Sequence, residues 1–298
     1  MASRVEAARP EGRRLRQVVL AIIALTVIAY GAAVVRLTMQ ETELIFRTAV
    51  ARADTRPAFP YTQIDLPRTD GARQFAWRLD RAAEGTNGHS SGDWVLYLHG
   101  NASTVASRMN VKHYTRLHEL GVNVLAPEYR GYNGLPGVPS EATVIADARA
   151  AYDYLRNGGG VSADRIVIFG WSLGGAIAVS LASAVEARGV VLEGTPASIV
   201  DIGAARYPLF PVRWIIRNPF NAIDKVRGVR APILFLHSPE DAVVPFAEGR
   251  RLFDAATAPK TFVEVRGGHI ESSEVDRDVF YGAVRSFLQA TSTPPPSH

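Results

Sequence analysis

The sequence predicts a mainly parallel, doubly wound α/β sheet, and three observations lead to this prediction. Short β-branched runs alternate with longer segments whose apolar residues recur at helical spacing, a pattern typical of helices that cover both faces of a parallel sheet. Two further strand-like runs separated by a turn precede them and predict an antiparallel hairpin at the sheet edge. A single interval, residues 195–229, interrupts the alternation. We therefore expect one α/β domain with one short cap insertion.

The segments of this domain follow one another in a regular order. The hairpin is predicted from residues 61–66 and 74–79. The later strands are predicted at Trp94–Leu98, 122–126, 165–169, 189–192, Ile233–His237 and 261–265. The helices are predicted at 103–120, 140–156, 173–187, 247–255 and 273–290. The domain then occupies residues 43–291, with the cap at 195–229 and a proline-rich tail at 292–298.

The composition excludes several classes of protein. With 298 residues, 47% of them hydrophobic, the chain can bury a core that needs no disulfide or metal. The absence of cysteine removes thiol catalysis, thiolate metal sites and disulfides. The formal net charge is only +4, and the basic residues form no run interleaved with aromatic residues, so nucleic-acid binding is not expected.

An apolar segment near the N-terminus predicts a membrane helix. Residues 18–35 contain no charged side chain, and as a helix they would be about 27 Å long, close to the hydrocarbon thickness of about 30 Å. The alternative is a cleaved signal peptide, because small residues around Gly31 resemble a cleavage site. The basic flank, residues 1–17, contains Arg4, Arg9, Arg13, Arg14 and Arg16. This bias favours a cytoplasmic N-terminus and an exported domain, which the signal-peptide alternative would instead secrete.

A candidate nucleophile lies between a strand and a helix. Residues 170–174 read Gly-Trp-Ser-Leu-Gly and match the form G-x-S-x-G, which is weak evidence by itself. The predicted strand before Ser172 and the predicted helix after it supply the strand–turn–helix context that the motif requires. The competing interpretation is an ordinary glycine-rich turn. In the functional interpretation, the glycines allow the sharp bend that lifts the serine hydroxyl clear of the sheet.

Two further residues are candidates to activate this serine. A serine hydroxyl needs a neutral imidazole to accept its proton and a carboxylate to orient that imidazole. Asp241 follows the strand Ile233–His237, and His269 follows the last predicted strand, so both lie at the edge of the sheet where α/β folds bind ligands. The alternatives are that Glu240 is the acid and that His269 is an ordinary loop histidine.

A tetrahedral intermediate would also need backbone N–H donors for its oxyanion. Leu173, at the start of the predicted helix, supplies one, and Asn101, in the loop after Trp94–Leu98, supplies the other. A compatible interpretation is that Asn101 or Ser103 caps the following helix.

Several motifs in order resemble a known family over about residues 43–288. They are Leu44–Phe46 (LIF), 98–101 (LHGN), 128–132 (EYRGY), 139–141 (PSE), 170–174 (GWSLG), 207–208 (YP), 211–214 (PVRW), 237–241 (HSPED), 244–245 (VP) and 268–269 (GH). On these motifs the chain resembles the α/β-hydrolase superfamily, and within it the BEM46-like, membrane-bound serine hydrolases. The resemblance implies an α/β-hydrolase fold, with Ser172 as nucleophile, Asp241 as acid, His269 as base and the Asn101 region as the oxyanion loop. Two positions depart from the family: Ser238 replaces a common glycine, and 220–222 read Phe-Asn-Ala where Phe-Asp-Ser is common.

The expected function is that of a membrane-anchored serine hydrolase that cleaves a carboxylic ester or thioester through an acyl-Ser172 intermediate, without a metal or cofactor. The resemblance suggests acyl-lipid or acyl-peptide substrates. The alternatives are a serine peptidase of the same fold and a catalytically idle, membrane-tethered interaction domain, against which the complete set of three residues counts. Cap residues expected to line an acyl pocket, to contact lipid, or simply to pack the cap onto the sheet are Tyr207, Leu209, Phe210, Trp214, Ile215, Ile216 and Phe220.

Overall fold

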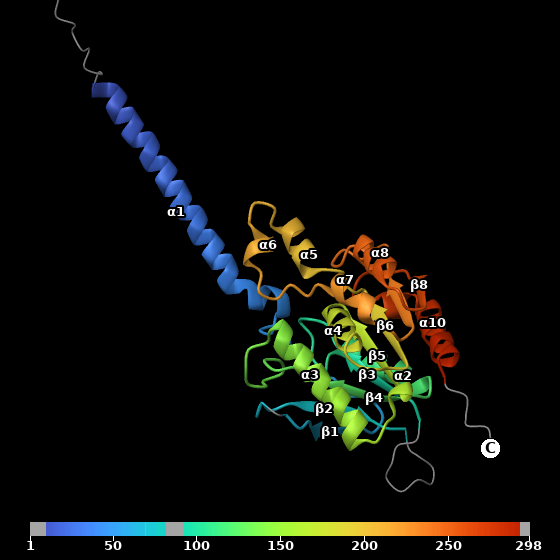
Figure 1. The fold of residues 1–298 in the computed structure, drawn as a ribbon. Helices are drawn as coiled ribbons and strands as arrows, with labels where there is room; N and C mark the ends of the chain where they lie inside the picture. Colours follow the sequence, from blue (N-terminus) through green and yellow to red (C-terminus); the bar gives the residue numbers. More distant parts are fainter. Residues whose placement is uncertain (1–9, 69, 82–91, 293–298) are drawn as a thin grey trace, which may run out of the picture.

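The fold is an eight-stranded, mostly parallel sheet with helices on both faces (Figure 1). The computed structural model describes residues 10–68, 70–81 and 92–292, so the first nine residues of the basic flank and residues 293–298 of the tail lie outside the described part. The strand order is β1-β2-β4-β3-β5-β6-β7-β8. The strands are β1 (Thr62–Asp65), β2 (Phe75–Leu79), β3 (Trp94–Leu98), β4 (Asn123–Pro127), β5 (Ile166–Trp171), β6 (Gly189–Glu193), β7 (Ile233–His237) and β8 (Lys260–Glu264).

The sheet confirms the predicted α/β-hydrolase architecture. Strands β1 and β2 pair antiparallel and β2 pairs antiparallel with β4, so that the predicted hairpin lies at one edge. Strands β4, β3, β5, β6, β7 and β8 are parallel. All their carboxyl ends therefore meet at one edge of the sheet, where loops from distant parts of the chain come together.

Helices cover the two faces of the sheet in separate groups. The helices of the body are α2 (Arg108–Glu119), α3 (Glu141–Asp153), α4 (Leu173–Ala182), α8 (Phe246–Ala255), α9 (Ser272–Val275) and α10 (Arg277–Ala290). Side chains of α3, α4 and α8 share one buried cluster with alternate strand residues such as Ile168 and Leu192. Side chains of α2 and α10 share the other cluster with the intervening residues, such as Phe169 and Val191. The period-two burial of the strands thus divides the core into two layers.

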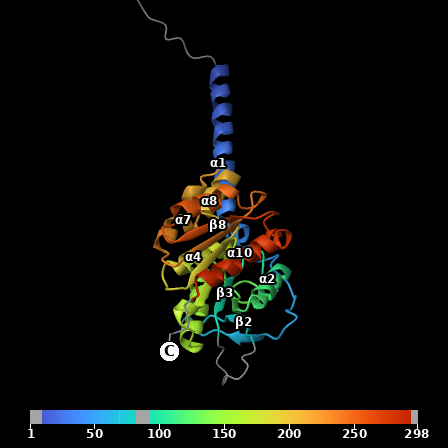
Figure 2. The ribbon, with the colours of Figure 1, turned by 90° about the vertical axis from the view of Figure 1, so that its right-hand side faces the viewer.

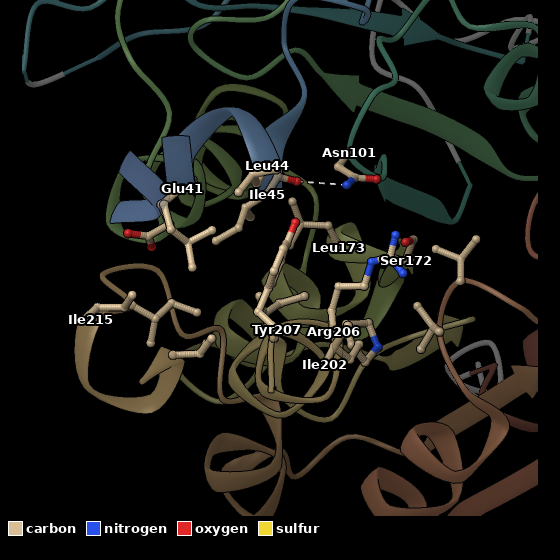
Figure 3. A pocket seen from close by; sticks show the side chains of 18 of the residues that line it. Glu41, Leu44, Ile45, Asn101, Ser172, Leu173, Ile202, Arg206, Tyr207 and Ile215 are labelled. Atoms are coloured by element: carbon tan, nitrogen blue, oxygen red, sulfur yellow. Dashed lines mark hydrogen bonds between the residues drawn. The ribbon is translucent and has the colours of Figure 1, made fainter. Parts of the chain in front are cut away.

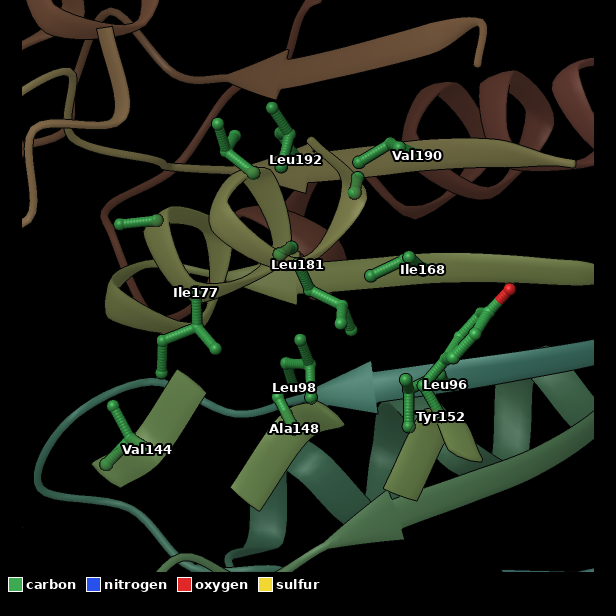
Figure 4. Close-up of a cluster of buried hydrophobic side chains, with 14 of the residues drawn as sticks. Leu96, Leu98, Val144, Ala148, Tyr152, Ile168, Ile177, Leu181, Val190 and Leu192 are labelled. Atoms are coloured by element: carbon green, nitrogen blue, oxygen red, sulfur yellow. The ribbon is translucent and has the colours of Figure 1, made fainter. Parts of the chain in front are cut away.

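Helix α4 is the best buried of these helices. All ten of its residues are buried, and Figure 4 shows Ile177 and Leu181 packing between the sheet and α3. Small residues on α4 let it approach the sheet closely, which fixes the position of the turn that precedes it.

The predicted helices differ from the observed ones mainly at their ends. Helix α2 begins at Arg108 instead of residue 103, because Thr104 donates its N–H to the Ser107 hydroxyl in a turn. Helix α4 ends at Ala182, five residues early. The segment 273–290 is broken at Asp276, whose carboxylate accepts hydrogen bonds from Arg266.

The interval 195–229 forms a cap over the carboxyl edge of the sheet. It contains α5 (Ile199–Arg206), α6 (Val212–Ile215), α7 (Ala222–Lys225) and a 3-10 turn at Val226–Gly228. In Figure 1, α5 and α6 lie above the body on the side from which α1 departs.

Helix α1 (Pro10–Phe46) projects from the body and is longer than the predicted span (Figures 1 and 2). It is long and apolar enough to cross a membrane, and the residues of its most apolar window are not buried in the protein. The helix does not end at residue 35, where the predicted span ends, but continues to Phe46. Its last turns join the domain, since Phe46 is fully buried and its ring contacts that of Phe220.

Polar contacts also hold the end of α1 against the cap. The buried Glu41 carboxylate accepts hydrogen bonds from the backbone N–H groups of Arg217 and Asn218 and from both of their side chains. Charge-assisted bonds of this kind are about twice as strong as neutral ones. The end of the helix is therefore attached to the cap through both apolar and polar contacts.

Candidate active site

The turn between β5 and α4 holds Ser172 in a strained conformation. Ser172 has φ 55° and ψ −121°, a region that residues other than glycine rarely adopt. Its N–H donates to the Glu193 carbonyl at 2.8 Å, and its own carbonyl accepts from the Gly175 N–H at 2.9 Å. These bonds, with the burial of α4, hold the bend in place.

The glycines on either side of Ser172 are required by close backbone contacts. A Cβ on Gly170 would lie 2.4 Å from the Gly174 carbonyl oxygen, and a Cβ on Gly174 would lie 2.0 Å from the Leu98 carbonyl oxygen. Real Cβ atoms do not approach backbone so closely. The motif therefore marks the place where α4 meets the sheet without room for side chains.

The structure brings Ser172, Asp241 and His269 together at the carboxyl edge of the sheet. His269 Nε2 lies 2.8 Å from the Ser172 hydroxyl, and His269 Nδ1 lies 2.6 Å from Asp241 Oδ2. With Nδ1 protonated toward the carboxylate, Nε2 is free to accept the serine proton. The Trp171 ring stacks on the imidazole, and its N–H donates to the His269 carbonyl at 3.4 Å.

Asp241 is the acid of its turn that contacts the imidazole. Its other oxygen, Oδ1, accepts from the backbone N–H groups of Val243 and Val244, each at 2.8 Å. Burial alone would raise the pKa of Asp241, but hydrogen bonds from His237 and His269 outweigh burial and hold that pKa well below its usual range. The carboxylate is therefore charged at neutral pH. The Glu240 side chain is exposed.

The loop that carries Asn101 lies against the serine. A Cβ on Gly100 would lie 3.2 Å from the Ser172 Cβ, and Asn101 and Leu173 line the same cavity as Ser172. The Asn101 side chain donates to the Ile45 carbonyl at 2.8 Å (Figure 3). Neither Asn101 nor Ser103 caps α2, whose N-cap is Ser107.

A buried carboxylate holds this loop in place. Glu128, at the end of β4, is fully buried beside His99. Its Oε1 lies 2.9 Å from His99 Nε2, and its Oε2 accepts from the Val105 N–H at 3.1 Å. Since His99 and Val105 flank Asn101 in sequence, Glu128 fixes both ends of the loop. In the sequence, the EYRGY motif (128–132) was only a feature of the resemblance. In the structure, its first residue, Glu128, positions the loop of Asn101.

A cavity of about 310 Å³ leads outward from Ser172 between α1 and the cap (Figure 3). Its walls are mainly apolar, which suits an acyl chain better than a charged substrate. The lining residues of α1 are Leu37, Thr38, Glu41, Leu44 and Ile45. The lining residues of the cap are Pro196, Ile199, Ile202, Gly203, Arg206, Tyr207, Val212, Ile215 and Ile216.

The α1 wall of the cavity was missed by sequence reasoning. The apolar period of α1 continues past the charge at Arg36 into Leu37, Leu44 and Ile45, and this continuation was the available signal. Arg206 was missed as well, and Figure 3 shows its side chain extending from α5 into the cavity.

The structure divides the cap residues for which the sequence left three roles open. Tyr207, Ile215 and Ile216 line the cavity. Phe220 is buried and packs the cap onto the body. Leu209 and Trp214 are exposed, and the Phe210 ring stacks on that of Tyr30 of α1, with 6.0 Å between the ring centroids.

Glu193 is a further buried acid, and it lies behind the serine turn. The Glu193 side chain, at the end of β6, is 2% exposed and lies 3.5 Å from His113 Nε2. Burial raises the pKa of Glu193 well above its usual value and lowers the pKa of His113 to about 3. Both groups are therefore neutral at neutral pH, which avoids a second negative charge near Asp241.

Comparisons with known proteins agree with this architecture. The model of the alpha/beta hydrolase family matches residues 85–260. An uncharacterized protein of Mycobacterium tuberculosis is 38% identical over 224 residues, which are 75% of this chain and 77% of that protein. The lysophosphatidylserine lipase ABHD12 of Danio rerio is 31% identical over 191 residues, 58% of this chain and 49% of the lipase. The Pyrococcus furiosus esterase Pf2001 superposes with a TM-score of 0.66 at 18% identity, over 83% of this chain and 98% of the esterase.

The protonated state of Glu193 predicts a pH-dependent stability. Because the folded state keeps a proton that the unfolded state loses above its pKa of about 4.3, Glu193 makes folding less favourable as pH rises from there toward its folded pKa. Glu193→Gln stays neutral throughout. We expect the melting temperature of Glu193→Gln, measured relative to the unchanged protein, to rise between pH 5 and pH 9. A difference that stays constant over this range would show that Glu193 is ionised in the folded protein.

Proposed function

The chain belongs to the alpha/beta hydrolase family, and from this premise we propose that it is a serine hydrolase that cleaves a carboxylic ester or thioester through an acyl-Ser172 intermediate. The observation that carries the proposal is the continuous hydrogen-bond chain from Asp241 through His269 to the Ser172 hydroxyl, with distances of 2.6 and 2.8 Å. Acyl transfer by a triad needs this arrangement of nucleophile, base and orienting acid.

In the proposed reaction, Ser172 Oγ attacks the acyl carbonyl while His269 Nε2 accepts the hydroxyl proton. Asp241 keeps the imidazole oriented and stabilises the imidazolium that forms. The backbone N–H groups of Leu173 and Asn101 are proposed to hold the oxyanion, each contributing about 3 kcal/mol in the transition state. The imidazolium then gives its proton to the departing alcohol or thiol. Water, deprotonated by the same imidazole, releases the acid and regenerates Ser172.

The apolar cavity supports an acyl chain on the acid side of the bond. Its walls from α1 and the cap are rich in Leu and Ile, and a preformed apolar cavity binds an acyl chain by removing its methylene groups from water, each worth about 0.8 kcal/mol. This lining favours an acyl ester or thioester over a peptide. A profile over p-nitrophenyl esters of increasing acyl length, run beside a peptide panel, tests this preference.

The nucleophile assignment predicts a covalent label at one residue. A fluorophosphonate should label the unchanged protein at Ser172, since its hydroxyl is the one hydrogen-bonded to His269. Ser172→Ala should lose the label and reduce turnover by on the order of 10⁴-fold or more. Peptide mass spectrometry locates the label, and Ser103→Ala is the control that keeps it. Labelling that persists in Ser172→Ala would falsify the assignment.

The acid assignment predicts unequal effects at two neighbouring positions. Asp241→Asn should lower kcat by roughly 10³ to 10⁴, because the amide no longer stabilises the imidazolium. Glu240→Gln, the matched control, should change kcat little, since the Glu240 side chain is exposed. Steady-state kinetics on one short ester compares the two. A larger loss in Glu240→Gln would mean that the acid is Glu240.

We further propose that α1 is a retained single-span anchor with a cytoplasmic N-terminus and an exported domain. The charge bias of the basic flank supports this orientation. Protease added to cells whose outer barrier has been opened should digest the domain and leave a fragment that contains residues 18–35. A mature N-terminus at Ala32 or Val34 would replace the anchor by a signal peptide, and a protease-resistant domain would reverse the orientation.

A further inference from the structure

The tip of the cap, residues 207–216, contacts α1 within the apolar run that is long enough to span a membrane. The Tyr30 hydroxyl donates to the Leu209 carbonyl at 2.8 Å, and the Tyr30 ring stacks on Phe210. Tyr30 lies five residues before Val35, where the charge-free run ends. At about 1.5 Å per residue, the contact is about 7 Å inside the end of the run. The medium that surrounds α1 at Tyr30 therefore also surrounds the cap tip.

The surface of the cap tip is suited to a lipid interface. Trp214 is 90% exposed and Leu209 is 80% exposed. Large apolar side chains grouped in this way point to an apolar partner. Arg213 and Arg217 of the cap flank Trp214 in sequence, and their side chains stay more than half exposed while they pair with Asp201 and Glu41. Tryptophan with flanking arginine is the composition found where proteins meet lipid headgroups.

The cavity passes between these same two elements. Leu37 and Leu44 on α1 and Ile215 and Ile216 on the cap are opposite walls of the space that reaches Ser172, and Figure 3 shows Leu44 and Ile215 on its two sides. Ile215 and Ile216 directly follow the exposed Trp214 in sequence. The outer part of the cavity therefore adjoins the apolar surface of the cap tip.

We propose that the cap tip is inserted in the membrane leaflet from which α1 emerges, and that the cavity admits the acyl chain of a bilayer lipid laterally, between α1 and the cap. The occupant of the exposed apolar surface is the lipid bilayer itself, because the surface is continuous with the apolar face of α1. The insertion of the tip rests on these contacts and on the proposed membrane anchor α1. The lipid-ester substrate rests on the proposed serine hydrolase function.

The depth of Trp214 tests the insertion without any catalysis. Of the four tryptophans, Trp77, Trp94 and Trp171 are buried in the domain, so Trp214 is the one available to lipid. The full-length protein is reconstituted in vesicles of phosphatidylcholine and phosphatidylglycerol, with or without bromine on the upper acyl chain. Bromine should quench the unchanged protein more strongly than Trp214→Phe. Equal quenching in the two would place the tip in water or against a second copy of the chain and overturn the insertion.

Charge on the tip tests the route into the cavity. Leu209→Asp combined with Trp214→Asp should lower turnover of a long-chain ester in vesicles about tenfold, because charged side chains are unfavourable inside a membrane. It should leave turnover of a short soluble ester unaffected. Val279→Asp, on exposed surface of α10 at the far side of the body (Figure 1), is the control that changes neither rate. Unchanged turnover of the vesicle ester would overturn lateral entry.

The two experiments separate the inference from the function on which it rests. If the unchanged protein hydrolyses neither ester, the proposed serine hydrolase function fails while the quenching result still decides whether the tip is inserted. If both esters are hydrolysed and the quenching is absent, the function stands and the insertion fails.

Discussion

The strained bend at Ser172 is the constraint on which the rest of the site depends. A non-glycine residue in this conformation costs about 1–3 kcal/mol, so the surrounding structure must hold it. Helix α4 does so by burying all its residues against the sheet, which is possible because Gly170 and Gly174 leave no Cβ between backbone segments. The bond from the Ser172 N–H to the Glu193 carbonyl then fixes the turn to β6. These contacts fix the backbone of Ser172, and they therefore fix the position of its hydroxyl.

Buried carboxylates hold the loops that surround this bend. Glu128 fixes the loop of Asn101, Asp241 orients His269, and Glu41 joins α1 to the cap. Each of them accepts several hydrogen bonds, since a buried charge with missing partners would cost several kcal/mol. Glu193 is the exception, because it lies within the protein as a neutral acid. The same physical rule therefore gives two results: Asp241, which accepts hydrogen bonds from N–H donors, stays charged, and Glu193, which accepts none from the described residues, takes a proton.

Helix α1 links its apolar run to the cavity at Ser172. Its apolar run has the length of a span, and its last turns supply a wall of the cavity and, through Ile45, a partner for Asn101. The helix runs without a break from Pro10 to Phe46, so the orientation of its apolar run is set by the contacts of its last turns with the domain. The cavity therefore has a defined direction relative to the helix, which a flexible tether would not provide.

The sequence by itself determined the strands, the turn at Ser172 and the apolar run, because each depends on residues that are neighbours in the chain. Period-two burial, glycines beside a serine and eighteen uncharged residues are local patterns, and the observed β3 and β7 have the predicted bounds. Only the tertiary structure decided that Asp241, and not Glu240, contacts His269, because adjacent side chains in a turn point in different directions. The structure also extended α1 to Phe46 and joined it to the cap. No local pattern predicts that contact, since Glu41 and its partner Asn218 are 177 residues apart and their pairing depends on how the whole sheet brings the two segments together.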